Sequence, residues 1–108
     1  MPRRPAAVRS SAEQMSEHAA DASRLLKALA NEKRLMILCL LVDGERTVSE
    51  LNAMLDLSQS ALSQHLAKLR EEGLVATRRD GQAIYYRLAD GNAAALIGTL
   101  HDLYCKRK

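Results

Sequence analysis

The chain has 108 residues and a formal net charge of +3, so it has room for one domain and none for a second. Its longest unbroken apolar run has eight residues (35–42), whereas a membrane-spanning helix needs about 20, which excludes a transmembrane protein. The mildly basic balance permits a nucleic-acid partner without requiring one. No apolar segment follows the arginines near the N-terminus, so we expect no secretory signal, no membrane partner and a cytoplasmic protein.

The first residues mix Pro, Arg, Ala and Ser without hydrophobic periodicity, which predicts a flexible N-terminal tail over 1–15. Residues 16–108 form the predicted domain. The tail is either a solvated terminus or an arm that reaches the minor groove of DNA through Arg3, Arg4 and Arg9.

Two helices are predicted next. The second can be capped by Asn31 and contains the run 35–42. Because this run is apolar all round, we expect its helix to be central and buried on most sides, and Asp43 and Gly44 to end it. The first helix starts at residue 16, and its apolar side chains recur at helical spacing: Ala22, Leu25, Leu26 and Leu29.

The pattern that follows predicts a helix-turn-helix. Thr47 and Glu50 have the spacing of a capping box, which opens a short helix. Residues 56–58 form a turn into a second helix over about 59–72. Gly73 is placed to end that helix in the left-handed conformation. The inward stripe of the second helix is Leu62, Leu66 and Leu69.

A hairpin and a last helix complete the predicted fold. Two alternating segments, 74–78 and 84–88, flank Asp80-Gly81, which is a strong signal for a two-residue hairpin. Asp90 can cap the last helix. This order of elements is that of a winged helix-turn-helix, mainly α with a small β-hairpin. One face of the last helix carries Ala93, Leu96, Ile97, Leu100, Leu103 and Tyr104.

The second helix of the helix-turn-helix has the composition of a DNA-reading helix. Its outward side chains are short and polar, which lets the backbone approach base edges in the major groove. Serine has a lower helix propensity than the Glu and Lys that usually keep a surface helix soluble, so solubility alone explains these serines less well than DNA contact does. Taken alone, the hairpin tip could equally be a solvated turn, but beside a recognition helix a basic wing that holds phosphate or the minor groove is the better interpretation. The candidate DNA contacts are Gln59, Ser60, Ser63, Gln64, His65 and Lys68 on the helix, and Arg78, Arg79 and Gln82 at the hairpin.

Over about residues 20–105 the chain resembles ArsR-type winged-helix repressors, in particular the branch that includes HlyU, BigR and SqrR. The resemblance implies a homodimer that binds operator DNA. It also implies that Cys39 and Cys105 form a pair that responds to oxidants or reactive sulfur. The segments that carry it are LKALANEKRLMIL (26–38), LSQSALSQHL (57–66) and LHDLYC (100–105), together with the cysteine at position 39.

The chain departs from the metal-sensing members of that family. The first helix of the helix-turn-helix has no Cys-x-Cys box, since it reads Glu50-Leu51-Asn52-Ala53-Met54. The last helix offers only Asp90 and His101 where zinc sensors carry two pairs of ligands. Zinc requires four N, S or O donors in a tetrahedral set. We therefore expect no metal and no other cofactor, and a metal-responsive repressor is the alternative.

The two cysteines differ in their predicted surroundings. Cys39 lies inside the apolar run, where a lone cysteine is most often a core residue. Cys105 precedes three cations, Lys106 to Lys108, which favour a thiolate, whereas the negative end of the helix dipole opposes it. Under the resemblance, oxidation or persulfide chemistry links the pair and lowers operator affinity. A DNA-binding competitor that senses nothing and displaces another repressor is the further alternative.

No phosphate-binding loop, nucleophile elbow or pair of catalytic carboxylates is present in the sequence, so we expect a protein that is not an enzyme. The last helix has a wider apolar stripe than packing in one domain requires, and this predicts a two-fold interface. Two recognition helices related in this way read half-sites about one DNA turn apart. The expected operator is therefore an imperfect palindrome in double-stranded DNA.

Overall fold

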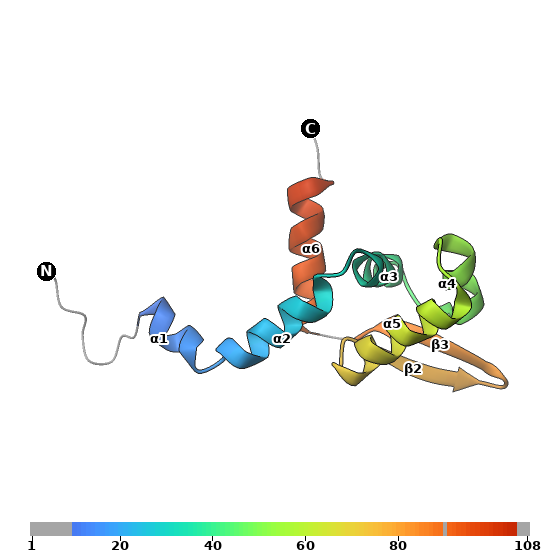
Figure 1. Ribbon diagram of the computed structural model, residues 1–108, viewed down its shortest axis with the longest axis horizontal. Helices are drawn as coiled ribbons and strands as arrows, with labels where there is room; N and C mark the ends of the chain where they lie inside the picture. Colours follow the sequence, from blue (N-terminus) through green and yellow to red (C-terminus); the bar gives the residue numbers. More distant parts are fainter. Residues whose placement is uncertain (1–9, 90, 106–108) are drawn as a thin grey trace, which may run out of the picture.

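The computed structural model describes residues 10–89 and 91–105, and it has the predicted order of helices and hairpin. Figure 1 shows α4, α5 and the hairpin on one side of the molecule, with α1, α2 and α6 on the other. No helix in these ranges is long and apolar enough to cross a membrane. The elements are α1 (Ser11–Ser16), α2 (Ala19–Leu29), α3 (Glu32–Val42), β1 (Arg46–Thr47), α4 (Val48–Met54), α5 (Gln59–Glu71), β2 (Val75–Asp80), β3 (Ala83–Leu88) and α6 (Asn92–Tyr104).

Helix α1 begins inside the segment that the sequence predicts as the tail. The backbone N–H of Glu13 donates to Ser10 Oγ at 3.0 Å, and the N–H of Ser10 donates to Glu13 Oε1 at 2.8 Å. This capping box starts a helix that buries none of its residues, so hydrophobic periodicity could not reveal it. Helices α1 and α2 extend away from the rest of the molecule (Figure 1). The arginines considered for a minor-groove arm lie outside the described residues.

Helix α3 crosses the middle of the molecule and is covered along most of its apolar run. Ile37, Leu38 and Leu41 are buried, and α5, β3 and α6 pack around them. Met36 and Val42 remain 43% and 54% exposed. The expectation that this helix is central and buried on most sides therefore holds for six of the eight residues of the apolar run, and its neighbours leave only the flank with Met36 and Val42 uncovered. Its predicted cap is confirmed, since Arg34 N–H donates to Asn31 Oδ1 at 3.0 Å.

The helix-turn-helix consists of α4 and α5. The Thr47 capping box is confirmed, with both of its hydrogen bonds to Glu50 present. Between the helices, Asn52 Nδ2 donates to the Leu57 carbonyl at 2.9 Å and holds the turn. Ser58 Oγ then accepts from the backbone of α5 and caps that helix. These local bonds fix the angle at which α5 leaves α4.

Helix α5 packs onto the core through the predicted stripe. Leu62, Leu66 and Leu69 are each at most 1% exposed. Gly73 follows the helix with φ +76°, the left-handed conformation expected there. These three leucines therefore define the buried side of α5, and the opposite side of the helix faces solvent.

The sheet has three antiparallel strands in the order β1-β3-β2. Asp80 pairs with Ala83, so Gly81 and Gln82 form the turn, one residue later than the sequence suggests. Gly81 has φ +66°, and glycine adopts this conformation without steric cost. The two-residue strand β1 is too short to show alternation, so the sequence pattern does not predict it.

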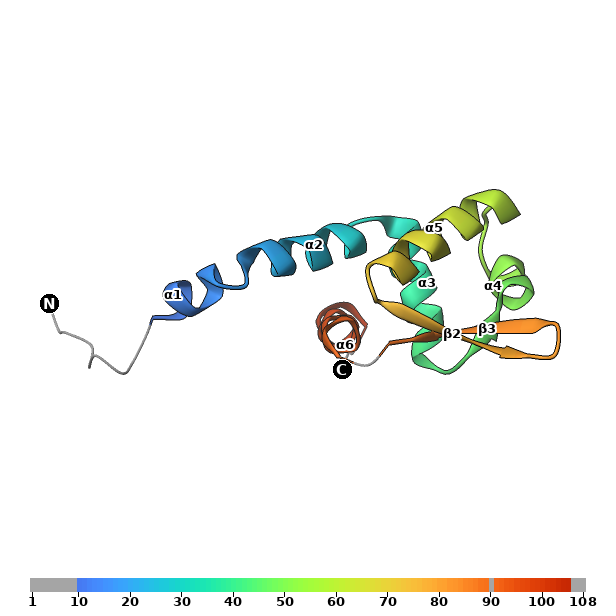
Figure 2. The same cartoon turned by 90° about the horizontal axis from the view of Figure 1, so that it is seen from below.

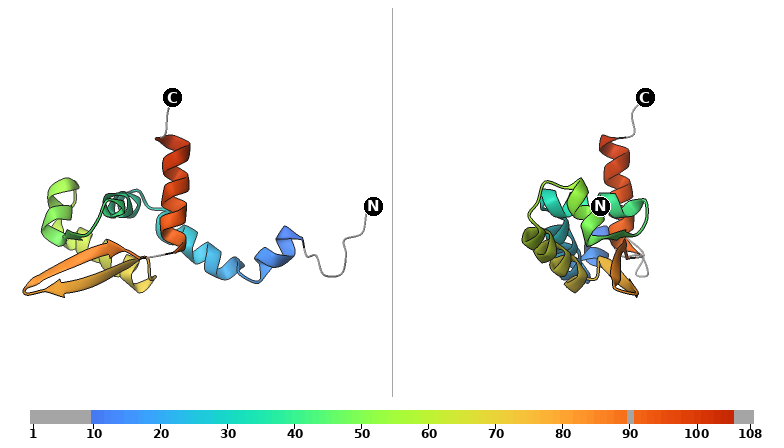
Figure 3. Two further views of the ribbon diagram at one scale, coloured as in Figure 1. Left: turned by 180° about the vertical axis from the view of Figure 1, so that it is seen from behind. Right: turned by 90° about the vertical axis from the view of Figure 1, so that its right-hand side faces the viewer.

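Helix α6 begins at Asn92 with Gly91 as its N-cap. The predicted cap, Asp90, stands one position too early and lies outside the described residues. Ala93 and Ile97 pack into the core near the start of α6. Figure 2 shows α6 end-on beside α2, and Figure 3 shows it rising out of the body of the molecule. Its last turns therefore stand clear of the core.

Candidate nucleic-acid interface

Helix α5 presents a polar face to solvent. Five of its six predicted contacts are exposed, and His65 is half-buried at the edge of the face. Since the leucines of α5 point into the core, the polar side chains project together from the opposite side of the helix. Such a face can enter the major groove of DNA and offer side-chain donors and acceptors to base edges. The exposed five are Gln59, Ser60, Ser63, Gln64 and Lys68.

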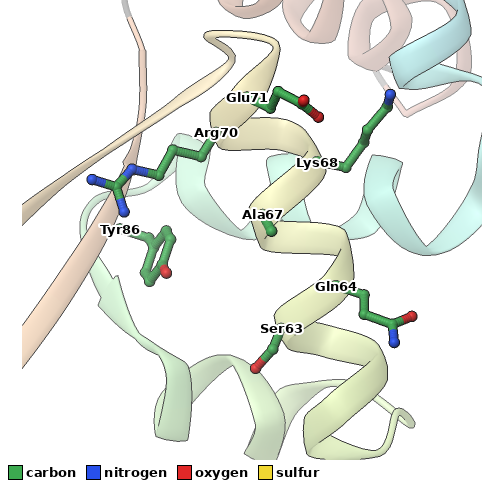
Figure 4. A pocket seen from close by; sticks show the side chains of 7 residues that line it. All are labelled: Ser63, Gln64, Ala67, Lys68, Arg70, Glu71 and Tyr86. Carbon is green, nitrogen blue, oxygen red and sulfur yellow. The ribbon is translucent and has the colours of Figure 1, made fainter.

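A shallow, open groove runs between α5 and strand β3. Figure 4 shows Gln64 and Lys68 on one flank of α5, with Ser63 on the flank that faces Tyr86. Arg70 also lies on the Tyr86 flank and adds a positive charge that the sequence analysis does not include. Its position seven residues after Ser63, two helical turns, is the signal that could have identified it. The groove is lined by Ser63, Gln64, Ala67, Lys68, Arg70, Glu71 and Tyr86.

A carboxylate holds the C-terminal end of α5 in place. Arg24 Nη2 of α2 donates to Glu72 Oε1 at 3.1 Å. Lys68 Nζ lies 3.6 Å from the other oxygen of Glu72. The end of α5 is thus tied to α2, and the charge of Lys68 is partly balanced within the protein.

His65 lies on the flank of α5 that borders the rest of the fold, and its side chain is half-buried. Its pKa is lowered from the usual 6.5 by burial and by the positive charge of Arg34. Arg34 is itself fixed, because its Nε donates to the Ala28 carbonyl at 2.8 Å at the end of α2. His65 therefore carries a neutral imidazole at neutral pH, and this form both donates and accepts hydrogen bonds.

The two arginines of the hairpin have different environments. The strand register places Arg78 opposite Tyr85 and Arg79 opposite Ile84, so the arginines lie on opposite faces of the hairpin. Arg78 Nε donates to both oxygens of Glu45, each at 2.8 Å, and this hydrogen bond lowers the pKa of Glu45. Arg79 is exposed and has no ion pair within the described part of the chain, and Gln82 at the turn is exposed as well. The two arginines are equivalent in the sequence pattern, whereas in the structure only Arg78 is bound by a carboxylate.

The two cysteines are close enough to influence each other. Cys39 on α3 is half-buried, whereas Cys105 follows α6 and is exposed, and both are free thiols. The pKa of Cys39 is raised by burial and by the negative charge of the Cys105 thiolate. Two residues 66 positions apart in the sequence thus lie within electrostatic range of each other. Within residues 10–89 and 91–105, no three His, Cys, Asp or Glu side chains form a group that could hold a metal ion.

The fold and the polar face of α5 define a winged helix-turn-helix regulator. Residues 31–77 match the family described as "Bacterial regulatory protein, arsR family". The chain is 53% identical over 94 residues to the transcriptional activator HlyU of Vibrio cholerae, which covers 87% of each protein. The structure of reduced HlyU from that organism matches with a TM-score of 0.81 over 87% of this chain and 99% of the other, at 53% identity.

Two further solved structures are similar. The transcriptional repressor BigR of Xylella fastidiosa has a TM-score of 0.83 and 41% identity, over 91% of this chain and all of the other. A winged helix-turn-helix domain from Mycobacterium bovis, described as homodimeric, has a TM-score of 0.72 and 30% identity, over 93% of this chain and 97% of the other. The chain belongs to the arsR family of bacterial regulatory proteins. Its relatives are DNA-binding transcriptional regulators and not enzymes.

Proposed function

We propose that the protein is a homodimeric repressor whose affinity for operator DNA falls when Cys39 and Cys105 become linked. The observation that carries the DNA-binding part is the exposed polar face of α5, with Ser63 and Gln64 at its centre. Exposed Arg79 on the neighbouring hairpin adds a cation that suits a phosphate contact. In this proposal the candidate contacts of α5 read bases, and exposed Arg79 and Gln82 of the hairpin hold the DNA backbone.

Exposed apolar side chains support the homodimer. Leu103 and Tyr104 at the end of α6 are 69% and 74% exposed, and Leu26 on α2 is exposed as well. Three large apolar side chains on two adjacent helices are costly to leave in water. A two-fold interface through α2 and α6 would bury them and place the two α5 helices on one side of the dimer. The operator is then an imperfect palindrome with half-sites about one DNA turn apart.

The electrostatic influence of Cys105 on Cys39 supports the thiol switch, because it places the two thiols in the same region of the fold. When a peroxide is the oxidant, the two thiols lose two electrons and two protons, an S–S bond forms, and the peroxide is reduced to water. When hydrogen trisulfide is the oxidant, one of its sulfur atoms stays between the cysteines and the other two leave as hydrogen sulfide. Either link would tie α3 to the end of α6 and alter the spacing of the two α5 helices in the dimer.

The proposed DNA binding is tested with two duplexes of about 30 base pairs. One is selected by the unchanged protein from a random-sequence pool, and the other has a mixed sequence and serves as the non-specific comparison. Gln64→Ala should weaken binding to the selected duplex by about 1–3 kcal/mol and leave the mixed duplex nearly unaffected, because it removes a base contact. Arg79→Ala should weaken both alike and reduce the salt slope by about 0.9, because it removes a phosphate contact. Equal losses for both variants on both duplexes would contradict the assignment of α5.

The thiol part is tested by titrating the selected duplex before and after treatment with a polysulfide or a peroxide. Treatment should weaken binding by tens-fold, which corresponds to a coupling of about 1–3 kcal/mol, and a dithiol reductant should restore it. Mass spectrometry should show an intrachain link between Cys39 and Cys105. Cys39→Ser and Cys105→Ser variants that still release DNA on treatment would overturn the switch and leave a regulator that senses nothing.

A further inference from the structure

The guanidinium of Arg78 is held by protein groups on several sides. Its Nε donates to Glu45 Oε1 and Oε2 at 2.8 Å each, and its Nη2 lies 2.8 Å from Oε1. Its Nη1 is 3.9 Å from Asp80 Oδ2. The ring of Tyr85 lies against it, 4.5 Å from the guanidinium carbon to the ring centroid. Two carboxylates and an aromatic face thus engage a side chain that sequence reasoning assigns to DNA.

These contacts join two parts of the fold that are 33 positions apart in the sequence. Glu45 lies in the short segment between α3 and the helix-turn-helix. The next residue, Arg46, is anchored to α3, because its Nε donates to the Leu40 carbonyl at 3.0 Å. The residue after that, Thr47, caps α4 and pairs with Tyr85 of β3. The segment 45–47, which connects α3 to the helix-turn-helix, is therefore bound to the hairpin through Glu45.

We propose that Arg78 is a positioning residue that sets the angle of the β2–β3 hairpin relative to the helix-turn-helix, and that Arg79 is the residue of that strand which contacts DNA. The assignment rests on the proposed DNA-binding function. Its central observation is that two consecutive arginines point to opposite faces of the hairpin. The half-exposed Arg78 is bound by Glu45 and stacks on Tyr85, whereas Arg79 is exposed with no ion pair among the described residues.

The chemistry of the tie requires arginine. A planar guanidinium can donate to both oxygens of a carboxylate and stack on a ring at the same time. A lysine keeps the charge but is a point donor, so it satisfies a DNA phosphate and cannot reproduce this geometry. Arg78→Lys therefore separates the two roles: it preserves a phosphate contact and breaks a positioning contact.

The tie is tested first in the free protein, by hydrogen exchange of the backbone amides in β2 and β3. Arg78→Lys and Glu45→Gln should each speed exchange by about two- to fivefold, the range expected for a partly exposed ion pair. Amide exchange in the double variant Glu45→Gln/Arg78→Gln should be no faster than in the single variants, because each single substitution already removes the contact between Glu45 and Arg78. Arg79→Lys is the matched control and should leave exchange unchanged. Unchanged exchange in Arg78→Lys would overturn the proposal.

The consequence for DNA is tested with the selected duplex over a range of salt concentrations. Arg78→Lys should weaken binding severalfold with the same salt slope as the unchanged protein. The charge-balanced double variant Glu45→Gln/Arg78→Gln should do likewise. Arg79→Gln should instead reduce the slope by about 0.9, the value for one lost phosphate contact on duplex DNA.

Two results in the DNA experiment have distinct meanings. If Arg78→Lys binds as the unchanged protein does and the double variant reduces the salt slope by about 0.9, Arg78 is a phosphate contact and the proposal is wrong. If the unchanged protein selects no duplex at all, the proposed DNA-binding function fails. In that case the exchange experiment still decides whether Arg78 holds the hairpin.

Discussion

At the scale of single residues, the surroundings of a side chain decide its role more than its chemical type does. Arg34 caps the end of α2, and Arg78 binds Glu45. Arg70 stays at the surface in the groove along α5, and Arg79 is exposed near the hairpin turn. A count of positive charge would treat these four alike, whereas Arg34 and Arg78 have hydrogen-bond partners within the protein and the other two have no ion pair among the described residues. His65 shows the same dependence, because burial and Arg34 decide its charge.

The lowered pKa of His65 predicts a pH-dependent stability. In the folded state His65 binds a proton less readily than in the unfolded chain, where its pKa is about 6.5. Its contribution to the free energy of unfolding is therefore fully present above pH 6.5 and decreases as the pH falls through 6.5 towards the folded pKa. We expect chemical denaturation to show this decrease in the unchanged protein, and a smaller one in His65→Gln. His101→Gln, on an exposed part of α6, is the control and should keep the full decrease.

At the scale of elements, each helix of the helix-turn-helix starts at a side-chain cap. Thr47 caps α4 and Ser58 caps α5, and both accept a hydrogen bond from the N–H three residues later. The carbonyl of Leu57, next to Ser58, is bound by Asn52. Because the exposed end of α5 is the part that would enter the groove, its cap also orders the first candidate contacts, Gln59 and Ser60.

The cap of α5 predicts the effect of a pair of serine substitutions. Ser58→Ala removes the acceptor for the Ala61 N–H and should lower the free energy of unfolding by about 1 kcal/mol, within the range of about 0.5–2 for such caps. Ser60→Ala lies inside the helix, where alanine is the better helix former, and should change stability by less than about 0.5 kcal/mol. Urea denaturation of both variants measures the difference. Equal effects would show that Ser58 is not the cap.

At the scale of the whole molecule, the two ends of the fold have different surfaces. The end with α5 and the hairpin carries polar and basic side chains, whereas α2 and α6 carry exposed Leu26, Leu103 and Tyr104. Figure 3 shows α6 projecting beyond the core, and the described residues leave Leu103 and Tyr104 in its last turn exposed. The Glu72–Arg24 pair connects the two ends, from α5 to α2.

The apolar end predicts how the association state responds to charge. Leu103→Lys places a cation in the proposed two-fold interface and should shift a dimer to a monomer in sedimentation experiments at micromolar concentration. The variant should also weaken binding to a palindromic duplex, since each monomer reads one half-site. Met54→Lys is the control, because Met54 is also exposed but lies on α4, away from α6. A monomeric unchanged protein would contradict the dimer.

The sequence alone determined the features that depend on residues close together in the chain. Caps such as Asn31 and Thr47 act on the N–H three residues later, and the leucines of α5 repeat at helical spacing. Gly73 takes the left-handed conformation at the predicted helix end. The winged helix-turn-helix and the polar face of α5 followed from these local patterns, because hydrogen bonds within a turn and the period of a helix are properties of neighbouring residues.

Only the tertiary structure decided which distant residues meet. Glu45 finds Arg78 33 positions later, and Arg24 finds Glu72 48 positions later. The exposed flank of α3 and the closeness of Cys39 to a cysteine at the other end of the chain were decided in the same way. No local pattern encodes such contacts, because a side chain's partner depends on how whole helices and strands pack, and one face of α3 is indistinguishable from another in an unbroken apolar run.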